Sequence, residues 1–324
     1  MMKEANGLLS IRGLRTHFQT RRGPVRAVDG VDLDIDHGQI VGVVGETGCG
    51  KSVTALSVMR LVASPPGKIV GGEVFFEGED LLRKPESHMR KIRGNDIAMI
   101  FQEPGSSLNP VFTVADQIAE TIELHQGLNS DDAHEKAKEM MHLVGVPDVD
   151  RRAKNYPHQF SGGMNQRIMI AMALSCNPKL LVADEPVTAL DVTIQAQILN
   201  LLVKLRDDLG TSIWLITHDL GVIAQTCEQV KVMYMGKIVE SADVYTIFTN
   251  PMHPYTEGLL KSIPRVDMEQ EDLAAIPGVV PSPHNLPTGC RFNTRCYLAD
   301  AECSSVEPEL IEKAPGHNVA CIKV

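Results

Sequence analysis

Three features of this 324-residue sequence predict an α/β fold. Apolar strand-like runs alternate with helical patterns, a glycine-rich loop joins one strand to a helix, and a later strand ends in two carboxylates. The composition, 43% hydrophobic and 22% charged, is that of an ordinary globular chain, and the length suits one large and one small domain. We therefore expect an α/β P-loop core with an antiparallel β-layer and a helical subdomain, followed by a small irregular C-terminal extension.

The glycine-rich loop is Gly45-Glu46-Thr47-Gly48-Cys49-Gly50-Lys51-Ser52, which fits the P-loop pattern. The apolar run at residues 40–44 predicts a buried strand before it, and residues 53–62 predict a helix after it. Glycines let backbone N–H groups approach a polyphosphate, and a helix N-terminus favours an anion. Lys51 can reach the β- and γ-phosphates, and the Ser52 hydroxyl can ligate Mg²⁺. The loop therefore predicts a nucleotide site.

Strands are predicted on both sides of this loop. Residues 8–18 and 25–35 have strand character, with Val31, Leu33 and Ile35 alternating with polar residues. Residues 71–76 predict a further strand after the P-loop helix. We expect these strands to form the antiparallel layer that leads into the nucleotide core.

Residues from about 88 to 160 predict the helical subdomain. A short apolar strand at 97–101 ends at Gln102, and residues 113–125 then show apolar positions spaced by four. Ser130 is the expected N-cap of a helix that runs to about residue 144.

The second half of the chain again alternates helices and strands. An apolar run at 180–185 delivers Asp184 and Glu185, and parallel strands place their ligands at such carboxyl ends. The other expected elements are helices at 165–174 and 192–209, the latter stopped by Gly210, a strand at 212–218, and a hairpin at 230–240 that turns at Gly236.

Prolines become frequent beyond Asn250, so we expect a nucleotide-binding domain at 1–250, including the helical subdomain, and an extension at 251–324. The net charge of −10 and an aromatic content of 4% disfavour a nucleic-acid partner. The N-terminus lacks the apolar region of a signal peptide, and no run approaches the roughly 18 apolar residues of a membrane span. We expect a cytoplasmic protein with reduced thiols.

Six motifs in order resemble the ATP-binding subunit of ABC transporters. They are Walker A at 45–52, the Q-loop at Gln102, the signature loop Ser161-Gly162-Gly163, Walker B with the catalytic glutamate at 180–185, the D-loop Ala189-Leu190-Asp191, and the switch histidine His218. The sequence is more closely similar to the D-type subunits of the dipeptide and oligopeptide (Dpp/Opp, peptide/nickel) importers. This finer resemblance rests on residues 160–164, 191–197, 253–256 and the late cysteines, and it covers nearly the whole chain after about residue 8.

The resemblance implies roles for individual residues. Asp184, with Ser52 and Gln102, is expected to hold Mg²⁺, and Glu185 to act as general base on the attacking water. Gln102 and His218 are expected to sense the γ-phosphate or the water. Phe18 is the candidate for stacking on adenine, with a structural aromatic as the alternative.

In the family the signature loop contacts nucleotide held by the P-loop of a second ATPase subunit. Ser161, Gly162 and Gly163 keep the capacity to bind phosphate, and Asp191 belongs to the same set of nucleotide contacts. This loop departs from the commonest form, Leu-Ser-Gly-Gly-Gln, because Phe160 is first and Met164 last. Met164 cannot make the hydrogen bonds of glutamine, which affects the partner's site and not the one built on Lys51.

Four cysteines follow the proline-rich segment: Cys290, Cys296, Cys303 and Cys321. Four thiolates in a reducing compartment indicate a metal or cluster site, and the family resemblance points to a [4Fe–4S] cluster. Zinc, with His317 or His284 as possible substitute ligands, is one alternative, and unrelated thiols are another. We expect the cluster to be structural, so that its loss leaves ATP binding at Lys51 intact.

The implied function is ATP hydrolysis that drives peptide uptake, from the cytoplasmic face of the inner membrane. A second ABC ATPase subunit, two transmembrane permeases and an extracytoplasmic substrate-binding protein are the partners that the resemblance implies. Import of nickel or another small solute is an alternative, as are a soluble non-transport ABC ATPase and a non-catalytic regulatory subunit. An intact Lys51, Asp184 and Glu185 argues against the last of these.

Overall fold

The computed structural model describes residues 7–188, 190–263 and 276–324. The chain folds into two compact units. Unit 1 comprises residues 1–35, 40–82 and 217–324, and unit 2 comprises residues 36–39 and 83–216. The expected boundary near residue 250 does not separate these units, because the C-terminal extension packs within the unit that holds the P-loop.

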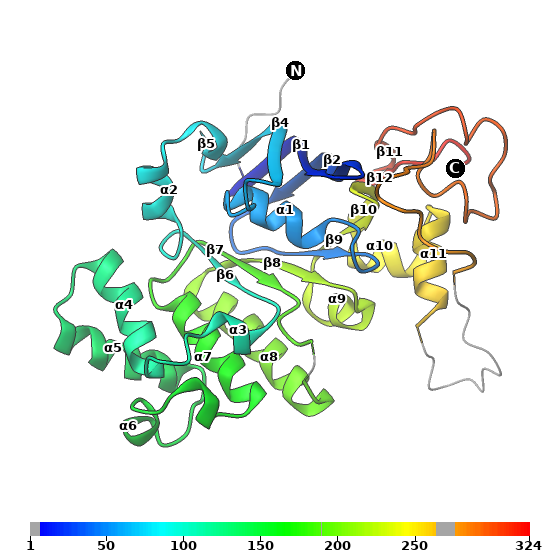
Figure 1. The fold of residues 1–324 in the computed structure, drawn as a ribbon. Helices are drawn as coiled ribbons and strands as arrows, with labels where there is room; N and C mark the ends of the chain where they lie inside the picture. The colour runs from blue at the N-terminus through cyan, green and yellow to red at the C-terminus, as the bar shows by residue number, and fades with distance from the viewer. Residues whose placement is uncertain (1–6, 189, 264–275) are drawn as a thin grey trace. The chain divides into compact units, whose positions relative to one another are not determined.

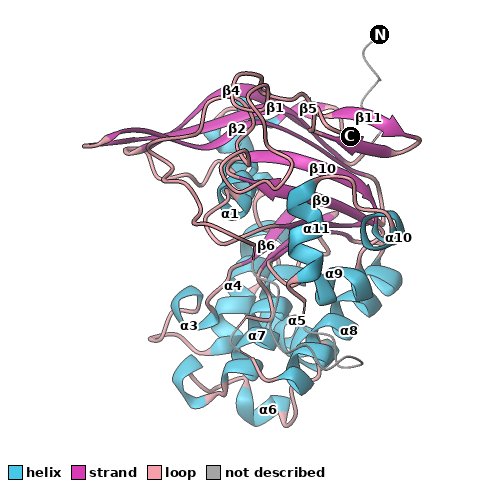
Figure 2. Cartoon of the chain, turned by 90° about the vertical axis from the view of Figure 1, so that its right-hand side faces the viewer, coloured by secondary structure: helices cyan, strands magenta, loops and turns pink. Residues whose placement is uncertain are grey.

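Unit 1 contains two groups of strands and several short helices (Figures 1 and 2). Its strands are β1 (Leu9–Thr20), β2 (Gly23–Ile35), β3 (Ile40–Val44), β4 (Gly67–Phe76), β5 (Glu79–Asp80), β9 (Gln229–Tyr234), β10 (Lys237–Asp243), β11 (Ile311–Ala314) and β12 (His317–Val319). Its helices are α1 (Lys51–Val58), α9 (Leu220–Thr226), α10 (Val244–Thr249) and α11 (Pro254–Lys261).

The antiparallel layer is confirmed as a sheet of order β2-β1-β4-β5. Val31, Leu33 and Ile35 of β2 are buried and alternate with exposed Asp32 and Asp34, as the pattern predicts. In the second group β3 pairs parallel with β9, β9 pairs antiparallel with β10, and β12 lies between β10 and β11. All five residues of β3 are buried, which explains its uninterrupted apolar run.

Unit 2 combines three parallel strands with a set of helices. The strands are β6 (Ile97–Ile100), β7 (Leu180–Asp184) and β8 (Ser212–Thr217), and β7 pairs with both of the others. The helical segments are α2 (Glu86–Ile92), α3 (Pro104–Ser107), α4 (Val114–Gln126), α5 (Ser130–Leu143), α6 (Val149–Arg152), η2 (Pro157–Gln159), α7 (Gly162–Leu174) and α8 (Val192–Leu209), with the 3-10 turn η1 (Leu81–Arg83) at the start of the unit.

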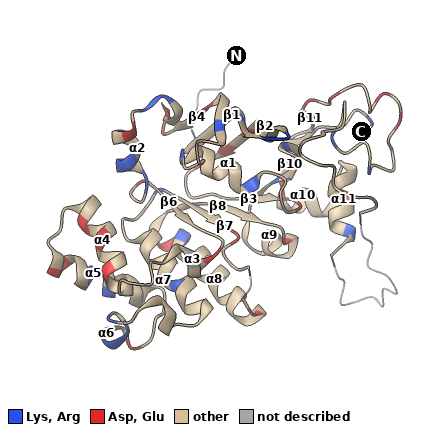
Figure 3. Ribbon diagram, viewed as in Figure 1, with Lys and Arg blue, Asp and Glu red and all other residues tan. Residues whose placement is uncertain are grey.

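Helix ends in unit 2 follow capping chemistry. Helix α8 begins after Asp191, whose side chain accepts from the Ile194 amide, and ends at Gly210 with φ of 70°. Helix α4 begins with a capping box at Thr113. The expected cap of α5 is wrong by one residue, because Asn129 and not Ser130 accepts the Asp132 amide. Helix α5 carries charged residues of both signs (Figure 3).

The C-terminal extension is held to unit 1 by buried side chains. Phe292 joins an apolar cluster that includes Val44, Tyr234 and Tyr255. The ring centroids of Phe292 and Tyr234 lie 5.3 Å apart in an edge-on arrangement. His317 of β12 is buried and contacts the buried Glu240 of β10 at 2.7 Å, between Nε2 and Oε1.

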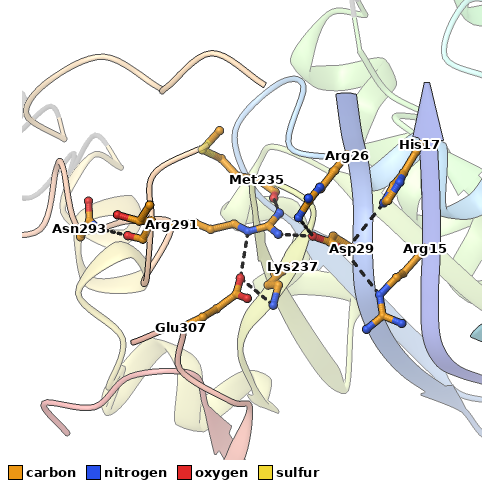
Figure 4. Close-up of polar contacts among 10 residues, drawn as sticks. Arg15, His17, Arg26, Asp29, Met235, Lys237, Arg291, Asn293 and Glu307 are labelled. Atoms are coloured by element: carbon orange, nitrogen blue, oxygen red, sulfur yellow. Dashed lines mark hydrogen bonds and ion pairs between the residues drawn. The ribbon is translucent and has the colours of Figure 1, made fainter. Parts of the chain in front are cut away.

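A second buried anchor is Arg291, only 6% exposed in its side chain. Its guanidinium donates to the Met235 carbonyl and to the Asp29 carboxylate of β2, and it lies 3.4 Å from Glu307 (Figure 4). Burial raises the pKa of Asp29, but the hydrogen bond and charge of Arg291 outweigh it and hold that pKa below its ordinary value. The extension therefore buries more than its sparse apolar pattern suggests.

Candidate functional site

The P-loop connects β3 to α1 and depends on the backbone freedom of glycine. Gly45, Gly48 and Gly50 all have positive φ, at 159°, 82° and 111°. A Cβ on Gly45 would lie 2.1 Å from the Met233 carbonyl oxygen, and one on Gly50 would lie 2.2 Å from that of Ala27. No side chain fits at these two positions, so the loop packs directly against the backbone of β9 and β2.

Lys51 is the buried cation of this loop, 5% exposed. Its Nζ donates to the Gly45 carbonyl at 2.7 Å and to the Glu46 carbonyl at 3.3 Å. The ammonium thus folds back over the loop. The sequence predicts that this ammonium binds phosphate. Ser52 follows in the first turn of α1 and is half-buried. Cys49 is buried and packs as an apolar side chain, and this burial raises the pKa of its thiol.

Asp184 and Glu185 are both buried at the end of β7, at 5% and 8% exposure. Gln102 donates from Nε2 to Glu185 Oε2 at 3.0 Å, and the Thr188 hydroxyl donates to the same oxygen at 2.9 Å. The structure therefore brings the expected Gln102 and Glu185 together. Thr188 escaped the sequence reasoning, although its position three residues after the glutamate was the available signal.

Glu185 has an unusual backbone conformation, with φ of 48°. Non-glycine residues with positive φ are uncommon and cluster at functional sites. Its amide donates to the Ile216 carbonyl of β8 at 2.8 Å, which anchors this turn on the neighbouring strand. The carboxylate is thus held by its backbone and by two side-chain donors.

The signature residues lie at the N-terminus of α7. Ser161 is the N-cap residue, but its side chain makes no capping hydrogen bond, and both Ser161 and Gly162 are exposed. A helix of 13 residues with uncapped N–H groups is suited to an anion. Gly163 lies close to Ile194 of α8, since a Cβ on it would meet that side chain at 2.8 Å.

The other expected nucleotide contacts, Phe18, Asp191 and His218, stay predictions. Phe18 is partly exposed and lies beside Gly67, and it does not line the 350 Å³ cavity next to residues 46–49. Asp191 uses its carboxylate to cap α8. His218 is exposed just after β8. Ala189 of the D-loop lies outside the described residues.

Sequence reasoning also missed the contacts between the P-loop and the C-terminal extension. Arg295 makes a two-pronged ion pair with Glu46, with Nη1–Oε2 and Nη2–Oε1 distances of 2.7 and 3.0 Å. The Glu46 amide donates to the buried Tyr255 hydroxyl at 2.9 Å. Part of the extension therefore contacts the P-loop itself. The expectation that loss of the cluster leaves ATP binding at Lys51 intact stays a prediction.

All four late cysteines line one small cavity, together with His253 and Phe292. Burial raises the pKa values of Cys290 and Cys296, and the neighbouring thiols raise them further. Within residues 7–188, 190–263 and 276–324, however, no three or more His, Cys, Asp or Glu residues are arranged as a metal site. The two alternative ligands lie elsewhere, since His317 pairs with Glu240 and His284 lines a different cavity.

Sulfur atoms in this cluster accept backbone hydrogen bonds from residues two positions later. The Phe292 amide bonds to Cys290 and the Leu298 amide to Cys296, which lowers both pKa values in part. The Lys323 amide donates to the Cys321 sulfur at 3.5 Å. Such N–H groups stabilise thiolates, and in metal–sulfur sites they help to set the reduction potential.

Comparison with known proteins identifies the family. The ABC transporter family profile matches residues 28–188, and that of the oligopeptide/dipeptide transporter C-terminal region matches residues 239–303. A probable peptide ABC transporter ATP-binding protein, y4tR of Sinorhizobium fredii, is 53% identical over 98% of this chain and 95% of its own length. The chain belongs to the ATP-binding subunits of peptide ABC importers.

Other relatives agree. The oligopeptide transport ATP-binding protein AppD of Bacillus subtilis is 51% identical, and the dipeptide transport ATP-binding protein DppD of Escherichia coli is 46% identical. Each alignment covers 97% of this chain and 96% of the relative. A dimeric ATP-binding cassette, MJ0796, in a post-hydrolysis state with ADP and phosphate, superposes with a TM-score of 0.66 at 26% identity. It covers 73% of this chain and 98% of its own.

These similarities confirm the expected P-loop ABC ATPase fold, with its antiparallel and helical subdomains and its C-terminal region. The chain is the ATP-binding component of a di- or oligopeptide import system, an ABC ATPase that uses ATP and Mg²⁺ and acts with other transporter components. A soluble ABC ATPase outside transport does not fit this family. Among the described residues, none of the helices is long and apolar enough to cross a membrane. The comparisons mention no iron–sulfur cluster.

Proposed function

We propose that Glu185 is the general base of ATP hydrolysis in this importer subunit. The observation that carries this assignment is the buried carboxylate at the end of β7, which accepts hydrogen bonds from Gln102 and Thr188 on one oxygen. The side chain is thereby oriented before substrate arrives, which is how a base accepts a proton from water without reorganisation. Gln102 couples the loop after β6 to the same carboxylate.

The P-loop residues 45–52 would hold the polyphosphate, with Lys51 on the β- and γ-phosphates. Ser52, Asp184 and Gln102 would hold Mg²⁺, which when bound neutralises charge that develops on the phosphates. The glycine conformations of the loop and its buried lysine support the phosphate part of this proposal. Phe18 stays the candidate for adenine and His218 for sensing of the γ-phosphate.

Replacing Glu185 with glutamine should preserve ATP binding and reduce turnover at least a hundredfold, because a neutral amide cannot act as base, and general bases contribute about 10²–10⁴-fold. Nucleotide retention and phosphate release are measured on the assembled transporter. The matched control is Glu120→Gln on α4, an exposed residue that receives the same chemical change. Near-normal turnover in Glu185→Gln would remove this residue from the catalytic role.

A second ATPase subunit completes each nucleotide site in this proposal. One chain carries one P-loop and one signature loop, and Ser161 and Gly162 are exposed at the start of α7. In the solved dimer of a related cassette two such chains associate. By family resemblance the complete importer adds two permeases and an external binding protein, and it places this chain at the cytoplasmic face of the membrane. Nickel or another small solute is the alternative cargo.

The isolated chain should therefore hydrolyse ATP slowly, and the addition of its partner ATPase subunit should raise the rate. The measurement is phosphate release at matched chain concentrations, together with the mass of the species in solution. Full activity from a proven monomer would contradict the shared-site arrangement. Copurification with membrane permeases tests the transporter assembly separately.

We also propose that the four-cysteine cavity is a metal site, with a [4Fe–4S] cluster as the first choice and Zn²⁺ as the second. The donor set is four thiols, and three of the sulfurs accept backbone N–H groups. A bound cation would offset the mutual repulsion of four thiolates. The site would staple an extension with few regular elements, in the manner of small metal-stabilised segments.

Anaerobically purified protein should be brown and contain about four iron atoms per chain, the stoichiometry of this cluster type. Cys296→Ser should bleach the protein and lower its melting temperature, because one ligand is lost. Cys176→Ser, which changes a cysteine outside the extension, is the control and should keep colour and iron. Colourless protein with one zinc per chain would exclude the iron–sulfur assignment and keep the site, and absence of any metal would exclude both.

A further inference from the structure

The ion pair between Glu46 and Arg295 joins the second residue of the P-loop to the C-terminal extension. The Arg295 side chain is 4% exposed and that of Glu46 is 28% exposed, so water screens the pair only from one side. Each guanidinium Nη atom donates to one carboxylate oxygen, Nη1 to Oε2 at 2.7 Å and Nη2 to Oε1 at 3.0 Å. This two-pronged geometry fixes the direction of the Glu46 side chain as well as its charge.

Arg295 is itself held in place by the extension and the core. Its Nε donates to the Pro277 carbonyl at 3.1 Å, and Nη1 lies 3.4 Å from the Tyr234 hydroxyl. The guanidinium carbon sits 5.9 Å from the ring centroids of both Tyr234 and Phe292. The guanidinium therefore cannot follow Glu46 if the loop moves, and it acts as a fixed clamp.

The backbone of Glu46 is restrained in addition to its side chain. Its amide donates to the Tyr255 hydroxyl at 2.9 Å, and Tyr255 is fully buried. Tyr255 belongs to α11, which lies in the extension at residues 251–324. Residues 280–283 of the extension also line the 350 Å³ cavity that residues 46–49 line. The Arg295 ion pair and the Tyr255 hydrogen bond thus connect the extension to one residue of the P-loop.

A carboxylate in a polyphosphate-binding loop opposes the charge of its ligand. Without a compensating cation, the negative charge of Glu46 would repel the phosphates and weaken their binding to the P-loop. We propose that Arg295 is a positioning residue for the nucleotide site, which neutralises Glu46, turns its carboxylate toward the extension, and so lets the C-terminal extension set the affinity for ATP. The inference rests on the proposed P-loop nucleotide site.

The neighbouring sequence gives this clamp a second consequence. Arg295 directly precedes Cys296 of the four-cysteine cavity, and Phe292 lies in the apolar cluster that also contains Val44, the last residue before the P-loop. A change in the order of the segment around Cys296 is therefore transmitted to Glu46 through one covalent neighbour. In this proposal the extension affects ATP binding through the Arg295–Glu46 ion pair, in addition to stabilising the fold.

The test is a double-mutant cycle on the full chain, with affinity for magnesium trinitrophenyl-ATP as the readout. Arg295→Met should raise the dissociation constant about tenfold, because it leaves the Glu46 carboxylate uncompensated near the phosphates. In the Glu46→Gln background the same substitution should change the constant by less than about twofold, since contacting residues couple and the opposing charge is gone. Arg295→Lys keeps the positive charge but loses the two-pronged geometry. Its dissociation constant should lie between those of the unaltered chain and Arg295→Met, and this variant replaces Arg295→Met in the cycle if the latter does not fold.

The matched control is Arg291→Lys, a second buried arginine of the extension that pairs with Asp29 instead of the P-loop. It should lower the melting temperature and leave nucleotide affinity within about twofold, which separates positioning from general stability. An equal loss of affinity in both Glu46 backgrounds, or no loss at all, would overturn the inference. Lys51→Ala must abolish binding of the probe; if it does not, the proposed nucleotide site fails first and the inference fails with it.

Discussion

Close packing of the P-loop backbone is the constraint on which the nucleotide-binding unit depends. Gly45 and Gly50 leave no room for a side chain, because the carbonyl oxygens of Met233 and Ala27 occupy that space. The loop is therefore fixed by β9 on one side and β2 on the other. The Gly236 amide donates to the Cys49 carbonyl at 2.7 Å, which adds the turn of the β9–β10 hairpin to this support.

This support explains why a small C-terminal extension can matter for the loop. The segments that support the P-loop also hold the extension, since Arg291 bonds to Met235 in the turn between β9 and β10 and to Asp29 of β2, and β12 pairs with β10. Arg295 reaches Glu46 through contacts of its own, with the Pro277 carbonyl and the rings of Tyr234 and Phe292. The cost of burying its guanidinium is offset by a carboxylate, a carbonyl and two aromatic rings.

Much of the core could be predicted because local chemistry and tertiary structure agree there. Helix α8 begins and ends at the residues expected, since Asp191 caps it and Gly210 stops it, and β3 and β8 match their apolar runs. The cap of α5 was wrong because Asn129 and Ser130 are both good capping residues and only the folded backbone selects between them.

The extension was less predictable for a physical reason. Strands β11 and β12 are short and partly exposed, so they leave no alternating pattern, and the residues that anchor the segment are charged. Arginine usually indicates a solvated surface, and the carboxylate partners of these two arginines, Asp29 and Glu46, lie about 250 residues away in sequence. The Thr188–Glu185 hydrogen bond had only the three-residue spacing as its signal, and the sequence does not show the positive φ at Glu185.

The most direct test of a P-loop that is coupled to the extension is amide hydrogen exchange of the full chain with and without magnesium ATP. Coupling is reciprocal, so nucleotide bound at residues 45–52 should also slow exchange at residues 290–297. In Arg295→Met the slowing should remain at the P-loop and disappear from the extension. Slowing confined to the P-loop in the unaltered chain would contradict the account.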